Sequence, residues 1–345
     1  MSTSRKNYDF IDLLKFIGSI LIFAMHMSAF ADFGESLNTY CLKLLARFGV
    51  PFFFVTSSFL LFSKADGRNI TGEQLKHYVK RITYLYLTYF VINLVWLLYS
   101  RIGLSNLLSP RAWFTFLKNA IFSSTFTGSW YLVSCIFSSI VIYWLSKRLS
   151  TRALLLVTAP VYMFCILTSA YAGLLPDTFL NGIKYYFASP QNSIICGLFF
   201  FAIGKYVAEK QKTVKHPCNS RLYGVLALVF HALYYVEVIL LDHFDILGGT
   251  DAALMLIPLS YTLTMYCINC NRNVKGASLM RKASTIIYCS QASVMFLAGV
   301  IATKLLGIHH TFVAFLIAAV GMAMFIGIVI WLQKKTKIKW AKYLT

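Results

Sequence analysis

The first long apolar stretch of the chain, residues 9–31, carries three ionisable side chains, Asp12, Lys15 and His26. Such a stretch is long enough to cross the roughly 30 Å of hydrocarbon in a bilayer, at about 1.5 Å per residue. Lys15 and His26 are eleven residues apart, which places them within about 20° of one helix face and about 16 Å apart along the axis. Ionisable groups in membrane helices face a bundle interior or a watery cavity. The stretch therefore predicts a polar site inside a helical bundle.

The composition is that of a multi-spanning membrane protein, because 58% of the 345 residues are hydrophobic and 13% are charged. It excludes a water-soluble domain. We predict an all-α, polytopic membrane bundle of about ten transmembrane helices, forming a single domain over residues 1–345. The predicted helices are centred near residues 10–31, 38–63, 82–100, 129–146, 153–173, 193–208, 222–241, 252–270, 284–305 and 311–332.

Basic residues are distributed unevenly between alternate connections. With ten helices, about 24 Lys and Arg residues lie on one side and about four on the other: Arg101, Arg111, Lys118 and Lys184. This positive-inside pattern predicts that both termini are cytoplasmic. It explains the net charge of +20 by contact with the lipid bilayer, so we expect no nucleic-acid partner. The first stretch has spanning length and no small-residue cleavage site, which predicts no cleavable signal peptide.

The second predicted helix contains a deeply placed basic residue, Arg47. If the helix starts near Leu37, Arg47 lies about 15 Å into the membrane, too far to reach either surface easily. Its guanidinium therefore needs an anionic or carbonyl partner. Pro51 frees a backbone carbonyl near Arg47, which provides an acceptor or a kink. A merely kinked structural helix would explain Pro51 but would leave Arg47 unexplained.

The polar residues of the first helix allow two interpretations. His26 can act as a general base toward an acceptor hydroxyl or amine, or it can pack against another helix through a hydrogen bond. Asp12 and Lys15, three residues apart, can form a pair on one helix face that lowers the cost of both charges. The first helix alone does not distinguish a catalytic site from a structural one.

Basic residues also gather before the third predicted helix. Lys76, Lys80 and Arg81 precede Tyr84 at a helix entrance on the predicted cytoplasmic side. Basic side chains and free backbone N–H groups at a helix N-terminus attract phosphate. The alternative is ordinary positive-inside anchoring.

Three further residues are candidates for substrate contact. Trp130 and Tyr131 stand near the predicted outer boundary, where aromatic belts are routine. Asn192 follows Pro190 at the start of the sixth predicted helix, so it can cap that helix. Taken by themselves, these residues read as anchors and a cap.

Other polar or aromatic features favour structural roles. The segment 101–129 mixes aromatic and basic residues, which suits a helix in the outer interface that acts as a lid or anchor. His231 and Glu237 need not share a site, and we expect each to be structural or interfacial. Cys267 and Cys270 form a CxxC pair without a second pair or a histidine cluster, so we expect no metal site.

Several motifs together resemble the bacterial membrane acyltransferase-3 family. The likeness spans the chain, and the order and placement of the motifs carry it. The motifs are Asp12-x-x-Lys15 with His26, the segment Arg47-Phe-Gly-Val-Pro51-Phe-Phe-Phe, Lys80-Arg81, Trp130-Tyr131-Leu132, Phe199 to Gly204, and Ser284-Thr-Ile-Ile-Tyr288.

The resemblance implies a ten-helix protein that moves acetyl or other short acyl groups from a cytoplasmic donor to sugars of cell-surface polymers. His26 would match the essential histidine of the family, Lys15 its basic partner and Arg47 its buried arginine. Three positions depart from the family pattern. Lys15 stands where arginine is commoner, so bidentate contact with an anion is lost, Ser58 occupies a usual glycine position, and Gln291 stands where histidine is frequent.

We therefore predict a membrane O-acetyltransferase, or one using another short acyl-CoA, in the plasma membrane of a bacterium. His26 acts as base or transient acyl carrier, and Lys15 or Arg47 stabilises the oxyanion, with Asp12 beside them. The donor phosphates meet the basic group around Lys80 described above. Trp130, Tyr131 and Asn192 line the site of a cell-envelope saccharide acceptor.

Two other functions stay open at this point. The same pocket could carry or bind a small solute without catalysis, or the chain could be an inactive relative. The acceptor, the acyl length, the side of the membrane on which transfer occurs and the oligomeric state do not follow from the sequence.

Overall fold

A computed structural model describes residues 8–65, 69–103, 109–187, 189–213, 219–270, 272–335 and 344–345. The side chains of Arg101 and Lys184, two of the four basic residues predicted on the outer side, lie outside the described part. In this part of the chain the secondary structure is helical, as predicted. The α-helices are α1 (Asp9–His26), α2 (Leu44–Ala46), α3 (Gly49–Phe62), α4 (Gly72–Ile92), α5 (Leu94–Leu97), α6 (Pro110–Phe122), α7 (Ser129–Leu145), α8 (Thr151–Leu167), α9 (Asp177–Phe187), α10 (Gly197–Thr213), α11 (Ser220–His243), α12 (Leu256–Asn269), α13 (Ala277–Val300) and α14 (Thr311–Lys335).

Short 3₁₀ and π-helical turns extend or connect these helices. Among the described residues, each of the ten segments predicted from the sequence contains a helix, and α6 forms inside the segment 101–129 predicted to hold an interfacial helix. The turns are η1 (Ala31–Phe33), η2 (Leu37–Lys43), η3 (Leu98–Ile102), η5 (Ala172–Leu174), η6 (Pro190–Asn192) and η7 (Ile301–Leu305).

Membrane-spanning length and apolar character coincide in four helical segments of the described chain: Leu37–Phe62, Ser220–His243, Ala277–Leu305 and Thr311–Lys335. A fifth is counted if the bent pair formed by α4 and the following residues to Ser100 is one span. The helices α7 and α8 are apolar but shorter. The chain is thus a helical protein with several membrane-spanning helices.

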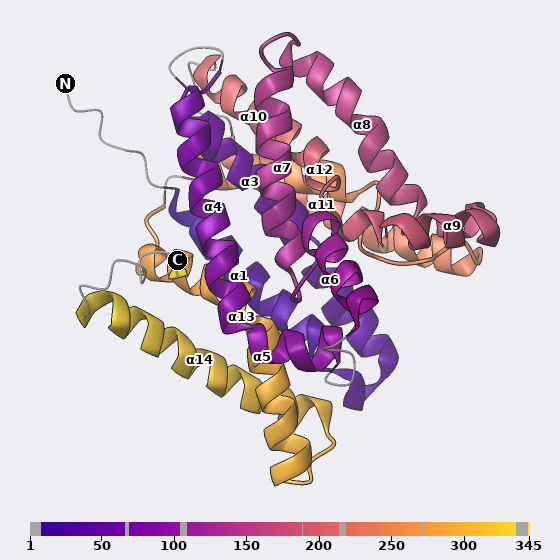
Figure 1. Ribbon diagram of the computed structural model, residues 1–345. Helices are drawn as coiled ribbons and strands as arrows, with labels where there is room; N and C mark the ends of the chain where they lie inside the picture. Colours follow the sequence, from indigo (N-terminus) through magenta and orange to yellow (C-terminus); the bar gives the residue numbers. More distant parts are fainter. Residues whose placement is uncertain are drawn as a thin grey trace.

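The helix α3 lies at the centre of the bundle. It packs most extensively against α10 and also contacts α1, α7 and α12. In Figure 1, α14 runs along one side of the molecule, while α8 and α9 lie on the opposite side. Burial follows this arrangement, because 72% of the apolar window of Leu37–Phe62 is buried but only 17% of that of Thr311–Lys335. The peripheral helix thus presents its apolar side chains outward, as lipid contact requires.

The contact between α3 and α10 depends on a glycine. A Cβ atom added at Gly204 would lie 2.4 Å from the carbonyl oxygen of Val55 and 2.5 Å from Cβ of Ser58. The hydroxyl of Ser58 donates to the carbonyl of Phe201 at 2.6 Å. Small residues allow helix backbones to approach in this way. Ser58, at a position where the family pattern has glycine, therefore contributes a hydrogen bond between the two helices.

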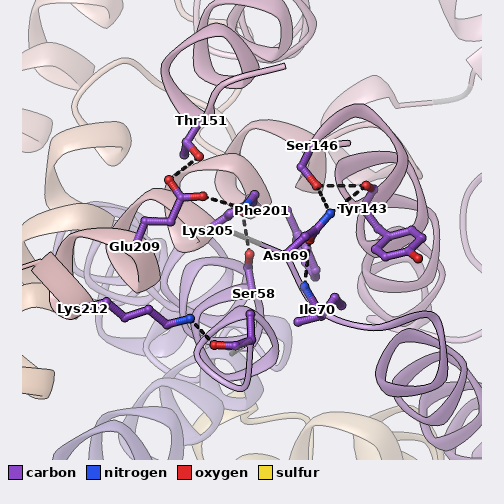
Figure 2. A network of polar contacts seen from close by, with 11 residues as sticks. Ser58, Asn69, Ile70, Tyr143, Ser146, Thr151, Phe201, Lys205, Glu209 and Lys212 are labelled. Carbon is purple, nitrogen blue, oxygen red and sulfur yellow. Dashed lines mark hydrogen bonds and ion pairs between the residues drawn. The ribbon is translucent and has the colours of Figure 1, made fainter. Parts of the chain in front are cut away.

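Polar contacts join α3, α8 and α10 near the end of α10 (Figure 2). Lys205, whose side chain is almost fully buried, lies 2.6 Å from a carboxylate oxygen of Glu209. The other carboxylate oxygen of Glu209 accepts a hydrogen bond from Thr151 at the start of α8, and Lys212 donates to the carbonyl of Ala65. The buried cation is thus paired, as burial of a charge requires.

A bend of 68° separates α4 from the helical residues that follow it. The buried side chain of Asn93 lies at the bend and donates to the carbonyls of Tyr89 and Cys289 at 2.7 and 3.1 Å. Its amide oxygen accepts hydrogen bonds from the backbone and hydroxyl of Ser293. An amide that satisfies carbonyls at a helix break supplies the partners that the helix itself no longer provides.

Candidate active site

A cavity of about 100 Å³ lies where the end of α1, the start of α3, the start of α7 and the loop before α12 meet. Its wall combines aromatic and aliphatic side chains with a small number of polar ones, which is the usual composition of a ligand site. The polar side chains are His26, Arg47, Gln191, Asn192 and Asp251.

His26 is the last residue of α1 and faces this cavity. The charges of Arg47 and Asp251 both act on its imidazole. Three groups from distant parts of the sequence thus surround one small space: an imidazole able to exchange protons, a fixed cation and a carboxylate. Such a set can move a proton and stabilise a developing negative charge.

Arg47 lies at the interruption between α2 and α3. Pro51 falls in the first turn of α3, where a helix does not need the missing N–H group. The guanidinium finds the anionic partner that its depth required: Nη1 lies 2.5 Å from Oδ1 of Asp251, and Nε donates to the hydroxyl of Thr250 at 3.0 Å. The Arg47 side chain is 19% exposed. Asp251 and Thr250 hold its guanidinium, and Arg47 also lines the cavity.

The loop that carries Asp251 is held in place by several hydrogen bonds. The backbone N–H of Ala252 donates to the hydroxyl of Ser169 at 3.2 Å. The carboxylate of Glu237 accepts the backbone N–H groups of Leu254 and Met255 at 2.8 and 2.9 Å, just before α12 begins. Glu237 therefore has a structural role, because it holds the residues just before α12. This keeps the loop in the position that places Asp251 beside Arg47.

The structure corrects the predicted pair of Asp12 and Lys15. Asp12 instead forms a bidentate ion pair with Arg281 of α13, with N···O distances of 2.6 to 3.0 Å. The ammonium of Lys15 lies 3.5 Å from the hydroxyl of Ser57. A planar guanidinium matches both carboxylate oxygens, which an ammonium on the same helix cannot do.

Lys15 also does not share the cavity with His26. The cavity wall includes His26 but not Lys15, because eleven residues of helix separate them by about 16 Å along the axis. A common helix face therefore did not mean a common site. The expectation that Lys15 stabilises an oxyanion beside His26 is not supported by this placement.

Aromatic side chains separate Lys15 from the cavity. The ring of Tyr131 lies 5.3 Å from that of Tyr288, and both pack edge-on against Phe53 at 6.2 and 5.9 Å. Tyr288 lines the cavity. The hydroxyl of Tyr131, predicted to stand at the outer mouth, instead bonds with Ser57 at 2.9 Å and donates to the Phe53 carbonyl. We call Phe53, Tyr131 and Tyr288 the aromatic layer.

The other two predicted substrate residues do line the cavity. Trp130 stands in the wall with its ring 5.8 Å from Phe54. Asn192 also faces the cavity, but it is not the cap of the sixth predicted helix, because η6 ends at Asn192 and α10 begins only at Gly197. The intervening turn carries Asn192 toward the cavity instead.

The predicted donor-binding residues lie along α4, away from this cavity. Lys76, Lys80 and Tyr84 follow one another at four-residue intervals on an exposed side of the helix, and the ammonium of Lys80 lies 5.7 Å from the centre of the Tyr84 ring. Arg81 is exposed as well, but its charge acts on Lys15. Arg81 thus belongs to the surroundings of Lys15, unlike the other three residues.

Sequence reasoning missed four residues of these polar sites: Gln191 and Asp251 in the cavity, and Ser57 and Arg281 near Lys15. A signal for Asp251 existed, because a deeply placed Arg47 required an anionic partner. Arg281 was counted only as a topological charge. No pattern within one helix points to Ser57 or Gln191.

A helical bundle with membrane-spanning segments and a polar cavity at its helix ends defines an integral membrane protein with an internal reaction or binding site. The chain belongs to the acyltransferase-3 family, because the family model described as "Acyltransferase domain" matches residues 8–344, nearly the whole sequence. The description of the family names acyl transfer as its reaction class.

The chain is also similar to a protein of Enterococcus faecalis named "Amino-acid racemase". The two are 27% identical over 265 residues, which cover 74% of this chain and 35% of that protein. The shared region therefore spans about a third of the length of the relative. No solved structure matches the chain.

Proposed function

We propose that the chain is a bacterial plasma-membrane acyltransferase with ten transmembrane helices and cytoplasmic termini. It transfers acetyl or another short acyl group from cytoplasmic acyl-CoA to a hydroxyl group of a cell-envelope saccharide. The observation that carries this proposal is the convergence of His26, Arg47 and Asp251 on one small cavity. Family membership supports the reaction class, and the basic connections support the orientation.

In the proposed reaction, Nδ1 or Nε2 of His26 takes the proton of the acceptor hydroxyl as its oxygen attacks the thioester carbonyl. The carbonyl oxygen becomes an oxyanion, which Arg47 stabilises. The carbon–sulfur bond then breaks, and the departing thiolate receives the proton from His26. The products are an ester and a free thiol, and the imidazole returns to its starting state.

The other lining residues have roles that follow from their chemistry. Trp130 offers an aromatic face on which a sugar ring can stack, and Asn192 and Gln191 offer amide groups for its hydroxyls. The donor approaches from the predicted cytoplasmic side, and its phosphates meet the basic residues that lie along α4: Lys76, Lys80 and Arg81, with Tyr84 beside them.

The decisive experiment replaces His26 with alanine in the purified, detergent-solubilised protein. With labelled acetyl-CoA and bacterial envelope fractions as acceptor, His26→Ala should lower transfer by at least 10²-fold, the usual worth of a general base. The matched control is His243→Ala, since His243 is exposed at the end of α11. Equal transfer by wild type and His26→Ala, with both proteins monodisperse, would remove His26 from the reaction.

A second function is passage or binding of a small solute without catalysis, and the relative named for amino-acid racemisation makes an amino acid the first solute to test. Reconstituted vesicles distinguish the two functions. Saturable amino-acid uptake that consumes no acyl donor would support the carrier, whereas transfer of labelled acetyl without uptake would support the enzyme.

A further inference from the structure

The start of α7 contributes its backbone to the cavity wall. Gly128, the residue just before the helix, lines the cavity and has no side chain with which to do so. Its φ of 85° lies in the left-handed region that favours glycine, and an added Cβ would lie 2.9 Å from Nε2 of Gln291. The first N–H groups of a 17-residue helix therefore lie beside the cavity, and no side chain at position 128 covers them.

One of these N–H groups lacks an acceptor. The hydroxyl of Ser129, the first helical residue, accepts the backbone N–H groups of Thr125 and Phe126 at 2.9 and 3.2 Å, so it does not cap the helix. The backbone N–H of Trp130, the next residue, makes no hydrogen bond within the part of the chain that the structure describes. Such groups carry the partial positive charge of a helix N-terminus and bind anions.

A buried amide beside this helix end points independently to a ligand. Gln291, on α13, is 0% exposed, and its Oε1 has no hydrogen-bond partner among the described residues. Its Nε2 donates to the carbonyl of Tyr288 at 3.1 Å, which uses one of the two protons of the amide. Because an unpartnered polar atom in a buried place is costly, the space beside Gly128 calls for a polar group that the described residues do not supply.

The fixed charges of the cavity wall do not meet this need by themselves. Arg47 and Asp251 both line the cavity, and they are paired at 2.5 Å. The carboxylate therefore offsets much of the attraction that the guanidinium offers to an anion. Neutral N–H donors stabilise a developing negative charge without bringing a counter-charge. Trp130 and Gln291 provide such donors from α7 and α13, which are separate from the segments that form the ion pair.

We infer that the backbone N–H of Trp130 and the side-chain amide of Gln291 form an oxyanion site for acyl transfer. This inference rests on the proposed function and deepens it. When the acceptor oxygen bonds to the thioester carbon, the electrons of the carbonyl double bond move to its oxygen, and His26 holds the acceptor's proton. The two N–H groups donate to this oxyanion, and Oε1 of Gln291 accepts a hydrogen bond from a further hydroxyl of the acceptor. When the carbon–sulfur bond breaks, the carbonyl re-forms and the thiolate takes the proton.

Transfer kinetics of the intact protein in detergent, with labelled acetyl-CoA and envelope fractions, test the amide. Gln291→Met keeps the length of the side chain and removes its polar atoms, so kcat should fall about 10²-fold while KM for acetyl-CoA stays within a few fold. The carboxyl group of Gln291→Glu donates only while it is protonated. The kcat of this variant relative to wild type should therefore fall as pH rises. Wild-type kcat in Gln291→Met would overturn the role of Gln291, as would a Gln291→Glu variant whose relative kcat does not change with pH.

A backbone substitution tests the helix end. Cell-free synthesis with the α-hydroxy acid analogue of tryptophan at position 130 exchanges the N–H for an ester oxygen and keeps the indole. This change should lower kcat at least tenfold with little effect on the melting temperature, because this N–H has no acceptor in the described protein. The matched control places the same analogue at Trp144, which is 60% exposed near the other end of α7. Equal kcat for the two esters would overturn the role of the helix end.

The outcomes also separate this inference from the proposed function. Gln211→Met, at a half-buried amide of α10 that bonds with Asn269, controls for loss of a glutamine and should match wild type. Acetyl transfer that needs His26 but neither Gln291 nor the Trp130 N–H would keep the acyltransferase and defeat the oxyanion site. Hydrolysis of acetyl-CoA that needs both groups, without transfer to the envelope fraction, would keep the site and defeat the saccharide acceptor. A wild-type protein that neither transfers nor hydrolyses would defeat both.

Discussion

Arg47 and Asp251 form an ion pair in the cavity wall, in which Nη1 of the arginine lies 2.5 Å from Oδ1 of the aspartate. The arginine comes from the interruption before α3 and the aspartate from the loop before α12, so the ion pair joins two segments that are distant in sequence. Thr250 holds Nε of the same guanidinium, and the carbonyl of Thr250 accepts the hydroxyl of Tyr234 at 2.9 Å. The direction in which Arg47 faces His26 is thus set by the loop.

This relationship predicts strongly non-additive effects on transfer. Arg47→Gln should lower acetyl transfer by about 10²–10³-fold through loss of oxyanion stabilisation, and Asp251→Asn should cause a loss of similar order because Arg47 is no longer oriented. The double variant should be little worse than Arg47→Gln alone, because either change by itself already removes the contribution of the oriented guanidinium. Initial rates for the four proteins give the coupling. Multiplicative losses would mean that the two residues act separately, and Asp177→Asn, in the exposed part of α9, is the control.

The close approach of α3 and α10 predicts a large stability effect of a single methyl group. Gly204→Ala should lower the free energy of unfolding by about 1–3 kcal/mol, because the new Cβ overlaps the backbone of Val55. Gly327→Ala, on α14, adds its Cβ to open space and should be close to neutral. The melting temperatures of the two variants are compared by thermal unfolding in detergent. Equal melting temperatures would show that α10 can move away from α3 without loss of stability.

Glu237 predicts a stability effect that reaches the site. Its carboxylate accepts two backbone N–H groups at the entrance of α12 and the hydroxyl of Tyr171 at 2.9 Å. Glu237→Ala leaves these donors without a partner, which should cost about 1–3 kcal/mol of unfolding free energy. Denaturation monitored by fluorescence tests this. Glu73→Gln, exposed in the first turn of α4, should match wild type.

The contact between Asp32 and the start of α14 should be sensitive to acid. The backbone N–H of Phe312 donates to its carboxylate at 2.8 Å, and this hydrogen bond holds the pKa of Asp32 below its ordinary value. Because the folded pKa lies below the unfolded one, the contact contributes fully above the unfolded value and is lost as pH falls through the folded value. Hydrogen exchange in the first turn of α14, corrected for intrinsic rates, should therefore rise in acid for wild type. Asp32→Ala should show the raised exchange already at neutral pH, and a pH-dependent rise in that variant would contradict the assignment.

The positions of the helices follow from local properties, which explains why they were predictable. An apolar run of sufficient length forms a helix wherever no competing partner exists for its backbone, and each of the ten predicted segments contains one. The bend at Asn93 was not predicted, because its cause is a set of hydrogen bonds to Cys289 and Ser293 on another helix. The helix α9 was also not predicted from the sequence.

Four of the predicted site residues line the cavity: His26, Arg47, Trp130 and Asn192. His26 and Arg47 could be found from the sequence because ionisable groups deep in a membrane helix are costly and mark functional sites. Helical spacing says which residues share a face but not what opposes them, so Asp12 was given Lys15 as partner instead of Arg281. For the same reason the hydrogen bond between Tyr131 and Ser57 could not be predicted.

The aromatic layer has a consequence for the cell's energy balance. Phe53, Tyr131 and Tyr288 are neutral rings packed against one another, and a bare ion would lose its hydration in passing them, at a cost of many kcal/mol. A neutral thioester arm bears no such penalty. In the proposed reaction, passage of the acyl arm through this layer would therefore leave the transmembrane ion gradients undissipated.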